Sequence, residues 1–163
     1  MNLRLLRTFE NNLKGAMAEE IAKELFIENG FDVEHYGVEY TVPSLNPRNR
    51  GNKLDPDCHN TKVIRQLPDL LIKKDGRTHL VEVKFRKNPK ETIKVPELFP
   101  HAYLLVISSN EVLFTNVKNY MLDKSSLVEI HQYNPLKLSD ESIEVCNSIV
   151  TKYYHVVIDR QVV

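Results

Sequence analysis

The sequence predicts a single α/β domain spanning residues 1–163, in which helices flank a mixed β-sheet. Two observations lead to this class. A helical pattern near the start of the chain is followed by a hairpin-like pair of short apolar runs, and two further short apolar runs come after the hairpin. With 42% hydrophobic and 27% charged residues, the chain has the composition of a globular protein that can bury a core.

The first elements follow from local patterns. We expect a helix over residues 13–30, where apolar side chains recur at helical spacing and Gly30 is suited to the position just past the helix end. Residues 31–40 alternate as a strand does. Residues 43–66 contain three prolines and little periodicity, which predicts a long basic loop.

A hairpin is the next predicted element, because two short apolar runs flank KKDGR. Asp75 and Gly76 suit a two-residue turn between antiparallel strands. In that register Asp69 lies opposite Glu82, and Lys84 shares their face of the sheet. The runs are continuous rather than alternating, so we expect both faces of the hairpin to be covered.

The remaining elements are predicted from shorter patterns. The segment 91–101 carries two prolines, so we expect only a short or broken helix there. Residues 118–163 form a C-terminal extension. The predicted elements from residue 102 onward are strands at 102–108 and 111–117, a helix at 118–123, a strand at 126–133, a helix at 139–153 and a last strand at 154–162.

The net charge is zero, which argues against a protein that holds nucleic acid by its overall charge. Residues 48–94, however, contain 13 basic and 6 acidic side chains, a net charge of +7 that the rest of the chain offsets. Any site for a polyanion must therefore be local. The cysteines are too few for a disulfide framework, and no membrane-length apolar stretch or signal-like start is seen, so we expect a cytoplasmic protein without a membrane partner.

Asp69 and Glu82 are the candidates for chemistry. Like charges directly opposite each other destabilise a sheet unless they are neutralised. A divalent cation with oxygen ligands would neutralise them, and Lys84 could offset charge and hold an attacking water. The alternative is that Glu82 and Lys84 belong to the solvated face of an amphipathic strand. A zinc site at Asp57-Cys58-His59 is not expected, because no second ligand pair follows at suitable spacing.

Helical geometry distinguishes Glu19 from Glu20. At 100° per residue, Glu19 borders the apolar face of the first helix and Glu20 points to solvent. Glu19 is therefore a further candidate for the site. The alternative is that it forms a surface pair with Lys23, four residues on.

Pro68-Asp69 and Glu82-Val83-Lys84 resemble the signature of the PD-(D/E)XK nuclease superfamily. The run KGAMAEEIAKELFIENGFDV is similar to Holliday-junction resolvase-like members of that superfamily, and the resemblance spans residues 14–38 and 67–108. It implies a three-layer restriction-endonuclease-like core with a catalytic hairpin. It also implies metal-dependent hydrolysis of phosphodiester bonds in DNA, as a structure-specific or restriction-type endonuclease, and a homodimer.

The resemblance also implies roles for individual residues. Asp69, Glu82 and Glu19, with the backbone carbonyl of Val83, would hold Mg²⁺, for which Mn²⁺ could substitute. Lys84 would position the attacking water. Basic residues near the site are expected to contact phosphates, and the five selected are Arg48, Arg50, Lys53, Arg86 and Lys87. Two other functions stay open: a catalytically inactive nucleic-acid-binding module that retains the nuclease fold, and a structural or partner-binding protein.

Overall fold

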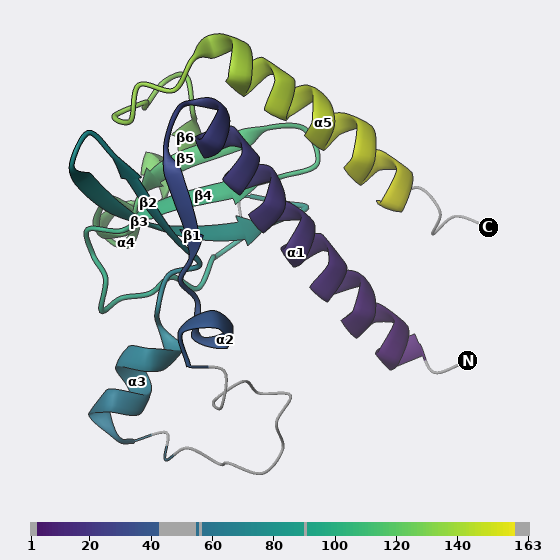
Figure 1. The fold of residues 1–163 in the computed structure, drawn as a ribbon. Helices are drawn as coiled ribbons and strands as arrows, with labels where there is room; N and C mark the ends of the chain where they lie inside the picture. Colours follow the sequence, from purple (N-terminus) through teal and green to yellow (C-terminus); the bar gives the residue numbers. More distant parts are fainter. Residues whose placement is uncertain (1–2, 43–54, 56, 90, 159–163) are drawn as a thin grey trace.

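A computed structural model of the chain describes residues 3–42, 55, 57–89 and 91–158 (Figure 1). Its helices are α1 (Leu3–Glu28), α2 (Val38–Thr41), α3 (His59–Arg65), α4 (Val117–Leu122) and α5 (Asp140–Ile158), with a 3-10 turn, η2, at Lys124–Ser126. Its strands are β1 (Asp32–His35), β2 (Leu70–Lys74), β3 (Arg77–Phe85), β4 (Tyr103–Ile107), β5 (Val112–Asn116) and β6 (Val128–Glu129). Within this part of the chain, every helix is too short or too polar to span a membrane.

The strands form a mixed sheet, as the sequence predicts. In the described residues it has six strands that lie side by side in sequence order, from β1 to β6. β3 and β4 run parallel, and the other neighbours are antiparallel. The α/β class with a mixed, helix-flanked sheet is therefore confirmed.

The predicted hairpin register is also confirmed. Leu70 pairs with Val81, and Lys74 pairs with Arg77 across the turn. Asp75 and Gly76 both have positive φ, of 50° and 73°. This is the backbone twist that a two-residue turn between right-twisted strands requires, and Asp-Gly is a sequence that favours it.

Apolar side chains cover both faces of the sheet, again as predicted. On one face, α1 and α5 pack together against the strands, with Phe26 and Tyr154 among the fully buried side chains (Figure 1). On the other face, Leu104 and Val106 of β4 pack with Ile93 from the β3–β4 connection and with α4. Alternate residues of the strands thus serve two cores, which explains the continuous apolar runs in the sequence.

Three expectations for the first half of the chain need correction. The first helix begins at Leu3, ten residues earlier than its predicted start, and Gly15 lies within it. The strand predicted at 31–40 ends at His35, because the chain turns at Gly37 and enters α2. The predicted loop at 43–66 contains α3, and its residues 43–54 and 56 lie outside the described part.

The second half shows similar differences. Turns rather than a short helix join β3 to β4 in the described residues of this connection, where prolines interrupt helical hydrogen bonding. The strand predicted at 126–133 is reduced to the two residues of β6. The strand predicted at 154–162 is wrong over residues 154–158, because α5 continues to Ile158 and buries Tyr154 at helical spacing from Val150, and residues 159–162 lie outside the described part. The helices predicted at 118–123 and 139–153 are confirmed as α4 and α5, with small shifts of their ends.

Candidate functional site

Asp69 lies at the start of the hairpin, and backbone hydrogen bonds hold it in place. It directly precedes β2, and its carbonyl oxygen accepts hydrogen bonds from the backbone N–H groups of Tyr36 and Gly37, at 2.8 and 3.3 Å. Its carboxylate Oδ2 accepts a hydrogen bond of 2.7 Å from the N–H of Val83 on β3. Backbone groups of two different segments therefore fix both the main chain and the carboxylate of Asp69.

Lys84 brings the two carboxylates of the hairpin together. Its Nζ lies 3.6 Å from Asp69 Oδ2 and forms an ion pair with Glu82 Oε1. The three side chains are largely buried, with Glu82 the least exposed at 10%. Strand alternation is the cause, because residues 82 and 84 share a face and Asp69 continues that face across the hairpin.

The pKa of Lys84 shows which charge state this cluster favours. Burial by itself lowers the pKa of an ammonium group, but attraction to Asp69 and Glu82 outweighs burial and raises the pKa of Lys84 above its usual value. Lys84 therefore stays protonated and supplies a positive charge at neutral pH.

The carboxylates carry more negative charge than Lys84 offsets. Burial, followed by repulsion from Asp69, raises the pKa of Glu82 to about 7. Burial also raises the pKa of Asp69, against the opposing effect of Lys84. Because desolvation and mutual repulsion both penalise the charged form, this group of side chains would gain from an additional cation.

Glu19 belongs to the same electrostatic cluster. It is half-buried on α1, whereas Glu20 is exposed, as helical geometry predicts. Burial, followed by repulsion from Asp69, raises the pKa of Glu19 to about 7. The alternative, a surface pair of Glu19 with Lys23, is not the contact observed, since Lys23 lies 3.4 Å from Glu20 instead.

Glu39 is a member of the cluster that the sequence analysis missed. Its negative charge contributes to the raised pKa values of Glu19, Asp69 and Glu82. Its side chain folds back over Gly37, where an added Cβ would lie 3.2 Å from Glu39 Oε2. The sequence signal for this contact was Gly37, because glycine often ends a strand and lets another group approach the backbone closely.

An aromatic pair borders the cluster. The rings of His35 and Tyr40 stack with their centroids 4.5 Å apart, and His35 Nε2 lies 3.4 Å from Glu20 Oε1. Burial, followed by repulsion from Glu19, raises the pKa of Tyr40. The end of β1 and the short helix α2 therefore lie beside the part of α1 that carries Glu19.

The predicted phosphate contacts are only partly visible. Arg48, Arg50 and Lys53 lie outside the described residues. Arg86 directly follows β3, is partly buried, and donates from Nη1 to the carbonyl oxygen of Phe85 at 2.8 Å. Lys87, the next residue, is exposed. Two of the five basic residues therefore directly follow the strand that carries Glu82 and Lys84.

The donor set for a metal ion is small. In the described part of the chain, no three His, Cys, Asp or Glu side chains form a group that could hold a metal ion. Asp69 and Glu82 supply two carboxylates. Mg²⁺ is commonly held by one or two carboxylates together with waters and substrate phosphates. Two carboxylates are within the number by which Mg²⁺ is commonly held, but they do not form a closed metal site.

The fold and the site together define a mixed α/β protein whose central hairpin carries a buried carboxylate–lysine cluster. Comparison of the chain with protein-family models, with curated proteins and with solved structures gave no match.

Proposed function

We propose that this protein is a magnesium-dependent nuclease of the PD-(D/E)XK type that hydrolyses phosphodiester bonds in DNA, as an endonuclease on a restriction-endonuclease-like core. One observation carries the proposal: Asp69, Glu82 and Lys84 converge on one side of a hairpin, mostly buried, with too little positive charge for the carboxylates. Buried charges without full compensation are costly and are typical of functional sites.

Each residue of the cluster has a role in this reaction. Asp69 and Glu82 would hold the magnesium ion, with the carbonyl of Val83 and with Glu19 as a further or water-mediated ligand. When bound, the ion would polarise the phosphate and offset the charge that develops on it. Lys84, which stays protonated, donates hydrogen bonds that orient the attacking water toward the phosphorus atom.

Substrate binding would depend on the positive charge near the hairpin. Arg86 and Lys87 directly follow β3, so they place two cations beside the strand that carries Glu82 and Lys84. Contacts of this type with the sugar–phosphate backbone provide affinity without reading the base sequence. Arg48, Arg50 and Lys53 are proposed as further phosphate contacts.

A catalytic test uses the purified chain with plasmid, branched and single-stranded DNA, and with RNA, in the presence of Mg²⁺ or Mn²⁺. We expect cleavage by the natural chain and none by Lys84→Met or Asp69→Asn. Lys73→Met is the matched control, because Lys73 is an exposed lysine on the same hairpin. Cleavage that survives both site substitutions would contradict the proposal.

The second candidate is a nucleic-acid-binding module without catalysis. The ion pair between Lys84 and Glu82 favours it, because an internal cation already offsets part of the negative charge. Salt-dependent binding of DNA with no cleavage under any metal condition would support this module and reject the nuclease. Absence of both binding and cleavage would instead indicate a protein whose cluster has a structural role.

A further inference from the structure

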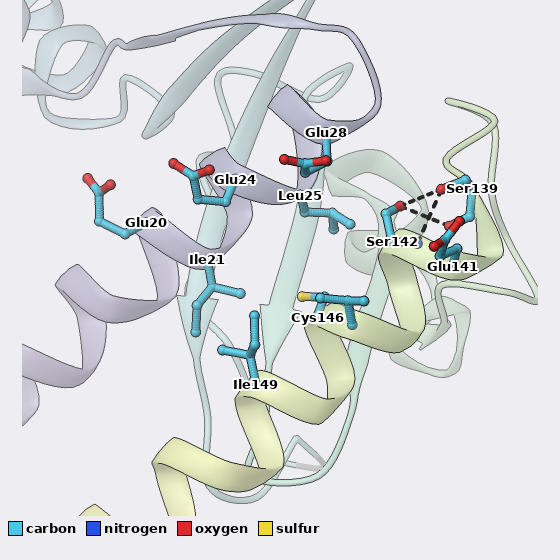
Figure 2. A pocket seen from close by; sticks show the side chains of 11 residues that line it. Glu20, Ile21, Glu24, Leu25, Glu28, Ser139, Glu141, Ser142, Cys146 and Ile149 are labelled. Carbon is cyan, nitrogen blue, oxygen red and sulfur yellow. Dashed lines mark hydrogen bonds between the residues drawn. The ribbon is translucent and has the colours of Figure 1, made fainter.

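Two different hollows adjoin the segment that follows α1, one lined by Glu28 and the other by Phe31. The first is a groove between α1 and α5 that has an apolar floor and an acidic rim (Figure 2). The rim consists of Glu20, Glu24, Glu28 and Glu141. The second has a volume of about 370 Å³ and lies between the turn of the β2–β3 hairpin and the loop that precedes α5. We call this second hollow the turn pocket.

The lining of the turn pocket is basic. Lys74 and Arg77 lie on either side of the hairpin turn, and Lys137 belongs to the loop before α5. Asp75 contributes one carboxylate, so the charged side chains of the lining carry three positive charges and one negative charge, a net charge of +2. In the described part of the chain, the three cations form no ion pair with a carboxylate. Their charge is therefore available to an anion from solution.

Two contacts fix the ammonium group of Lys74. Its Nζ donates a hydrogen bond of 2.7 Å to the carbonyl oxygen of Asn29 and lies 5.0 Å from the centroid of the Phe31 ring. Phe31 is buried, so the ring is itself held in place. Because an ammonium group has three N–H donors, two remain for a ligand. The side chain is already ordered, so little rotational freedom is lost when an anion binds.

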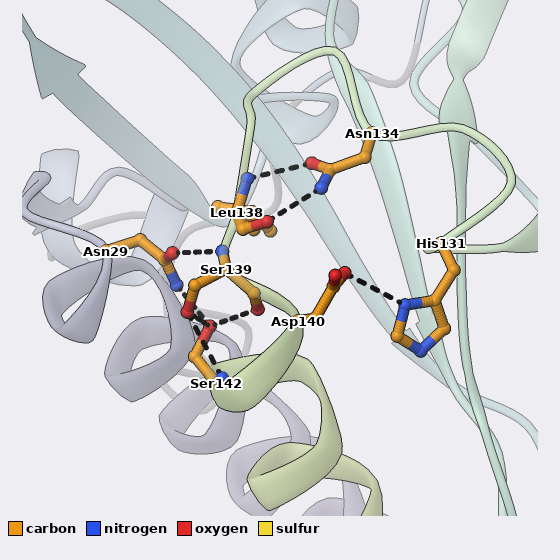
Figure 3. Close-up of polar contacts among 7 residues, drawn as sticks. All are labelled: Asn29, His131, Asn134, Leu138, Ser139, Asp140 and Ser142. Carbon is orange, nitrogen blue, oxygen red and sulfur yellow. Dashed lines mark hydrogen bonds and ion pairs between the residues drawn. The ribbon is translucent and has the colours of Figure 1, made fainter.

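The loop that carries Lys137 is held by hydrogen bonds of its own (Figure 3). The side chain of Asn134 donates from Nδ2 to the carbonyl oxygen of Leu138 at 2.8 Å, and its Oδ1 accepts a bond of 2.9 Å from the N–H of Leu138. Lys137 lies inside this bridge and has a positive φ of 55°, which is unfavourable for a residue with a side chain. Backbone strain of this kind is concentrated at ligand-binding sites, so the conformation of Lys137 indicates a binding role.

Asn29 connects the hairpin to this loop. Its carbonyl oxygen holds Lys74, and its side-chain Oδ1 accepts a hydrogen bond of 2.6 Å from the N–H of Ser139, at the end of the loop. Its Nδ2 donates to Ser142 Oγ and to the carbonyl oxygen of Leu25, both at 2.7 Å. The two basic segments of the turn pocket are therefore positioned relative to each other before a ligand binds, which lowers the cost of binding.

His79 adds an uncharged donor to the turn pocket. Burial, followed by repulsion from Arg77, lowers the pKa of His79, so its ring is neutral at pH 7. A neutral imidazole still has one N–H group that can donate to an anion. An anion beside the ring would favour the protonated form and raise the pKa of His79, which makes this residue a marker for ligand binding.

The turn pocket is remote from the carboxylate–lysine cluster. Arg77 and Lys84 lie at opposite ends of β3, and a strand rises about 3.3 Å per residue, so their Cα atoms are roughly 20 Å apart. Because strand side chains alternate, Arg77 and His79 also lie on the face of β3 opposite to that of Glu82 and Lys84. A ligand in the turn pocket therefore does not occupy the proposed nuclease site.

We propose that the turn pocket binds a small phosphate monoester. The phosphate of a monoester carries close to two negative charges at neutral pH, which matches the net charge of the lining, and its oxygens accept hydrogen bonds from Lys74, Arg77 and Lys137. Phe31 and Leu136 supply apolar surface for the organic group. The volume is in the range of small-molecule sites. This proposal does not depend on the proposed nuclease function.

Calorimetric titration of the full chain with phenyl phosphate tests the proposal. EDTA is present, so that the anion cannot bind through a metal ion at the carboxylate–lysine cluster. We expect a dissociation constant below about 1 mM. Phenyl sulfate is the matched anion, because it has nearly the same shape but one negative charge, and it should bind at least about tenfold more weakly.

Substitutions locate the bound anion. Lys137→Met and Arg77→Met should each raise the dissociation constant at least about tenfold, since each removes a charge-assisted hydrogen bond. Both side chains are exposed, so folding should be unaffected. Lys73→Met is the matched control, because Lys73 adjoins Lys74 in the sequence but points to the opposite face of β2. Nitrogen NMR of the imidazole should show that phenyl phosphate raises the pKa of His79 in the natural chain.

Three results would overturn the proposal. The first is a natural chain that does not bind phenyl phosphate at about 10 mM, and the second is equal binding of phenyl sulfate. The third is binding that Lys137→Met and Arg77→Met leave unchanged but that Arg86→Met with Lys87→Met abolishes, since the anion would then lie beside the carboxylate–lysine cluster. The nuclease proposal is tested separately, by cleavage of DNA.

Discussion

Acidic side chains gather in two regions of this protein, and the two regions differ in their contact with water. In the carboxylate–lysine cluster, Glu82 is 10% exposed and its pKa is raised to about 7. Along the rim of the α1–α5 groove, Glu24 and Glu28 are exposed. Glu19 and Glu20 are neighbours on α1, yet one belongs to the buried cluster and the other to the rim.

The difference indicates what each region can do. Where water is excluded, electrostatic interactions are strong, and a cation or a proton must compensate the negative charge. Where water is present, a carboxylate contributes little to stability and mainly selects the charge of a partner. Substitutions of charges in the buried cluster should therefore have the largest effects, and substitutions at uncharged contacts between α1 and α5 should have smaller ones.

The largest effect is expected for Lys84→Met, which removes the internal cation of the cluster. If the proposed function holds, cleavage should fall by at least about 10³-fold, because orientation of the attacking water is lost. The folded state should also lose about 3 kcal/mol at pH 8, since Asp69 and Glu82 are left without their partner. Chemical denaturation measures the second effect independently of catalysis.

The matched control for this prediction is Lys73→Met on the exposed part of the same hairpin. Its free energy of unfolding should stay within about 0.5 kcal/mol of that of the natural chain. If both lysine variants lose the same stability, the ion pairs of Lys84 contribute no more to the free energy of unfolding than an exposed lysine does.

A smaller effect is expected from pH and magnesium. The pKa of Glu82 is about 7 in the folded protein and 4.5 in the unfolded chain, so its contribution to stability is present below pH 4.5 and is lost as the pH rises through 7. Allowing for screening and coupling, we expect the free energy of unfolding to fall by about 2 kcal/mol between pH 5 and pH 8. The melting temperature should then be about 5 °C lower at pH 8 than at pH 5.

Calorimetry in EDTA and in Mg²⁺ measures this dependence. Magnesium should restore part of the melting temperature at pH 8, because a bound cation favours the charged carboxylates. Glu82→Gln should flatten the pH dependence and reduce the response to magnesium. A natural-chain melting temperature that rises between pH 5 and pH 8 in EDTA would contradict the assignment, and so would a fall in Glu82→Gln as large as in the natural chain.

The third prediction concerns the connection between the two helices that form the groove. Asn29→Ala removes hydrogen bonds to Leu25, Ser139 and Ser142. It should lower the free energy of unfolding by about 2 kcal/mol. Urea denaturation measures this loss. Asn119→Ala, at an exposed position of α4, is the control and should have little effect. Equal losses in the two variants would show that the groove is not held by Asn29.

The parts of the site that the sequence predicted depend on local geometry. The register of Leu70 with Val81 follows from the Asp75-Gly76 turn and strand alternation, and the half-buried position of Glu19 follows from the helical repeat. Such periodicities can be recognised directly from the order of the residues. They place side chains on a face before any tertiary contact is known.

The parts that were missed depend on contacts between distant segments. Glu39 reaches the cluster only because the chain breaks at Gly37 and folds back over it. The sequence from residue 154 onward has the β-branched composition of a strand, but Tyr154 is fully buried between α1 and the sheet. Tertiary packing outweighed local propensity at that position.

Tyr154 also provides the smallest effect that we expect. Burial raises the pKa of Tyr154, so its hydroxyl keeps the proton and donates a hydrogen bond of 3.0 Å to the carbonyl oxygen of Lys14 on α1. Tyr154→Phe removes this bond but retains the ring, which stacks on Phe85 with centroids 4.4 Å apart. Urea denaturation should show a loss of about 1 kcal/mol that does not change with pH between 5 and 8, in contrast to substitutions in the carboxylate–lysine cluster. A pH-dependent loss would mean that the contact between α1 and α5 is coupled to the buried charges after all.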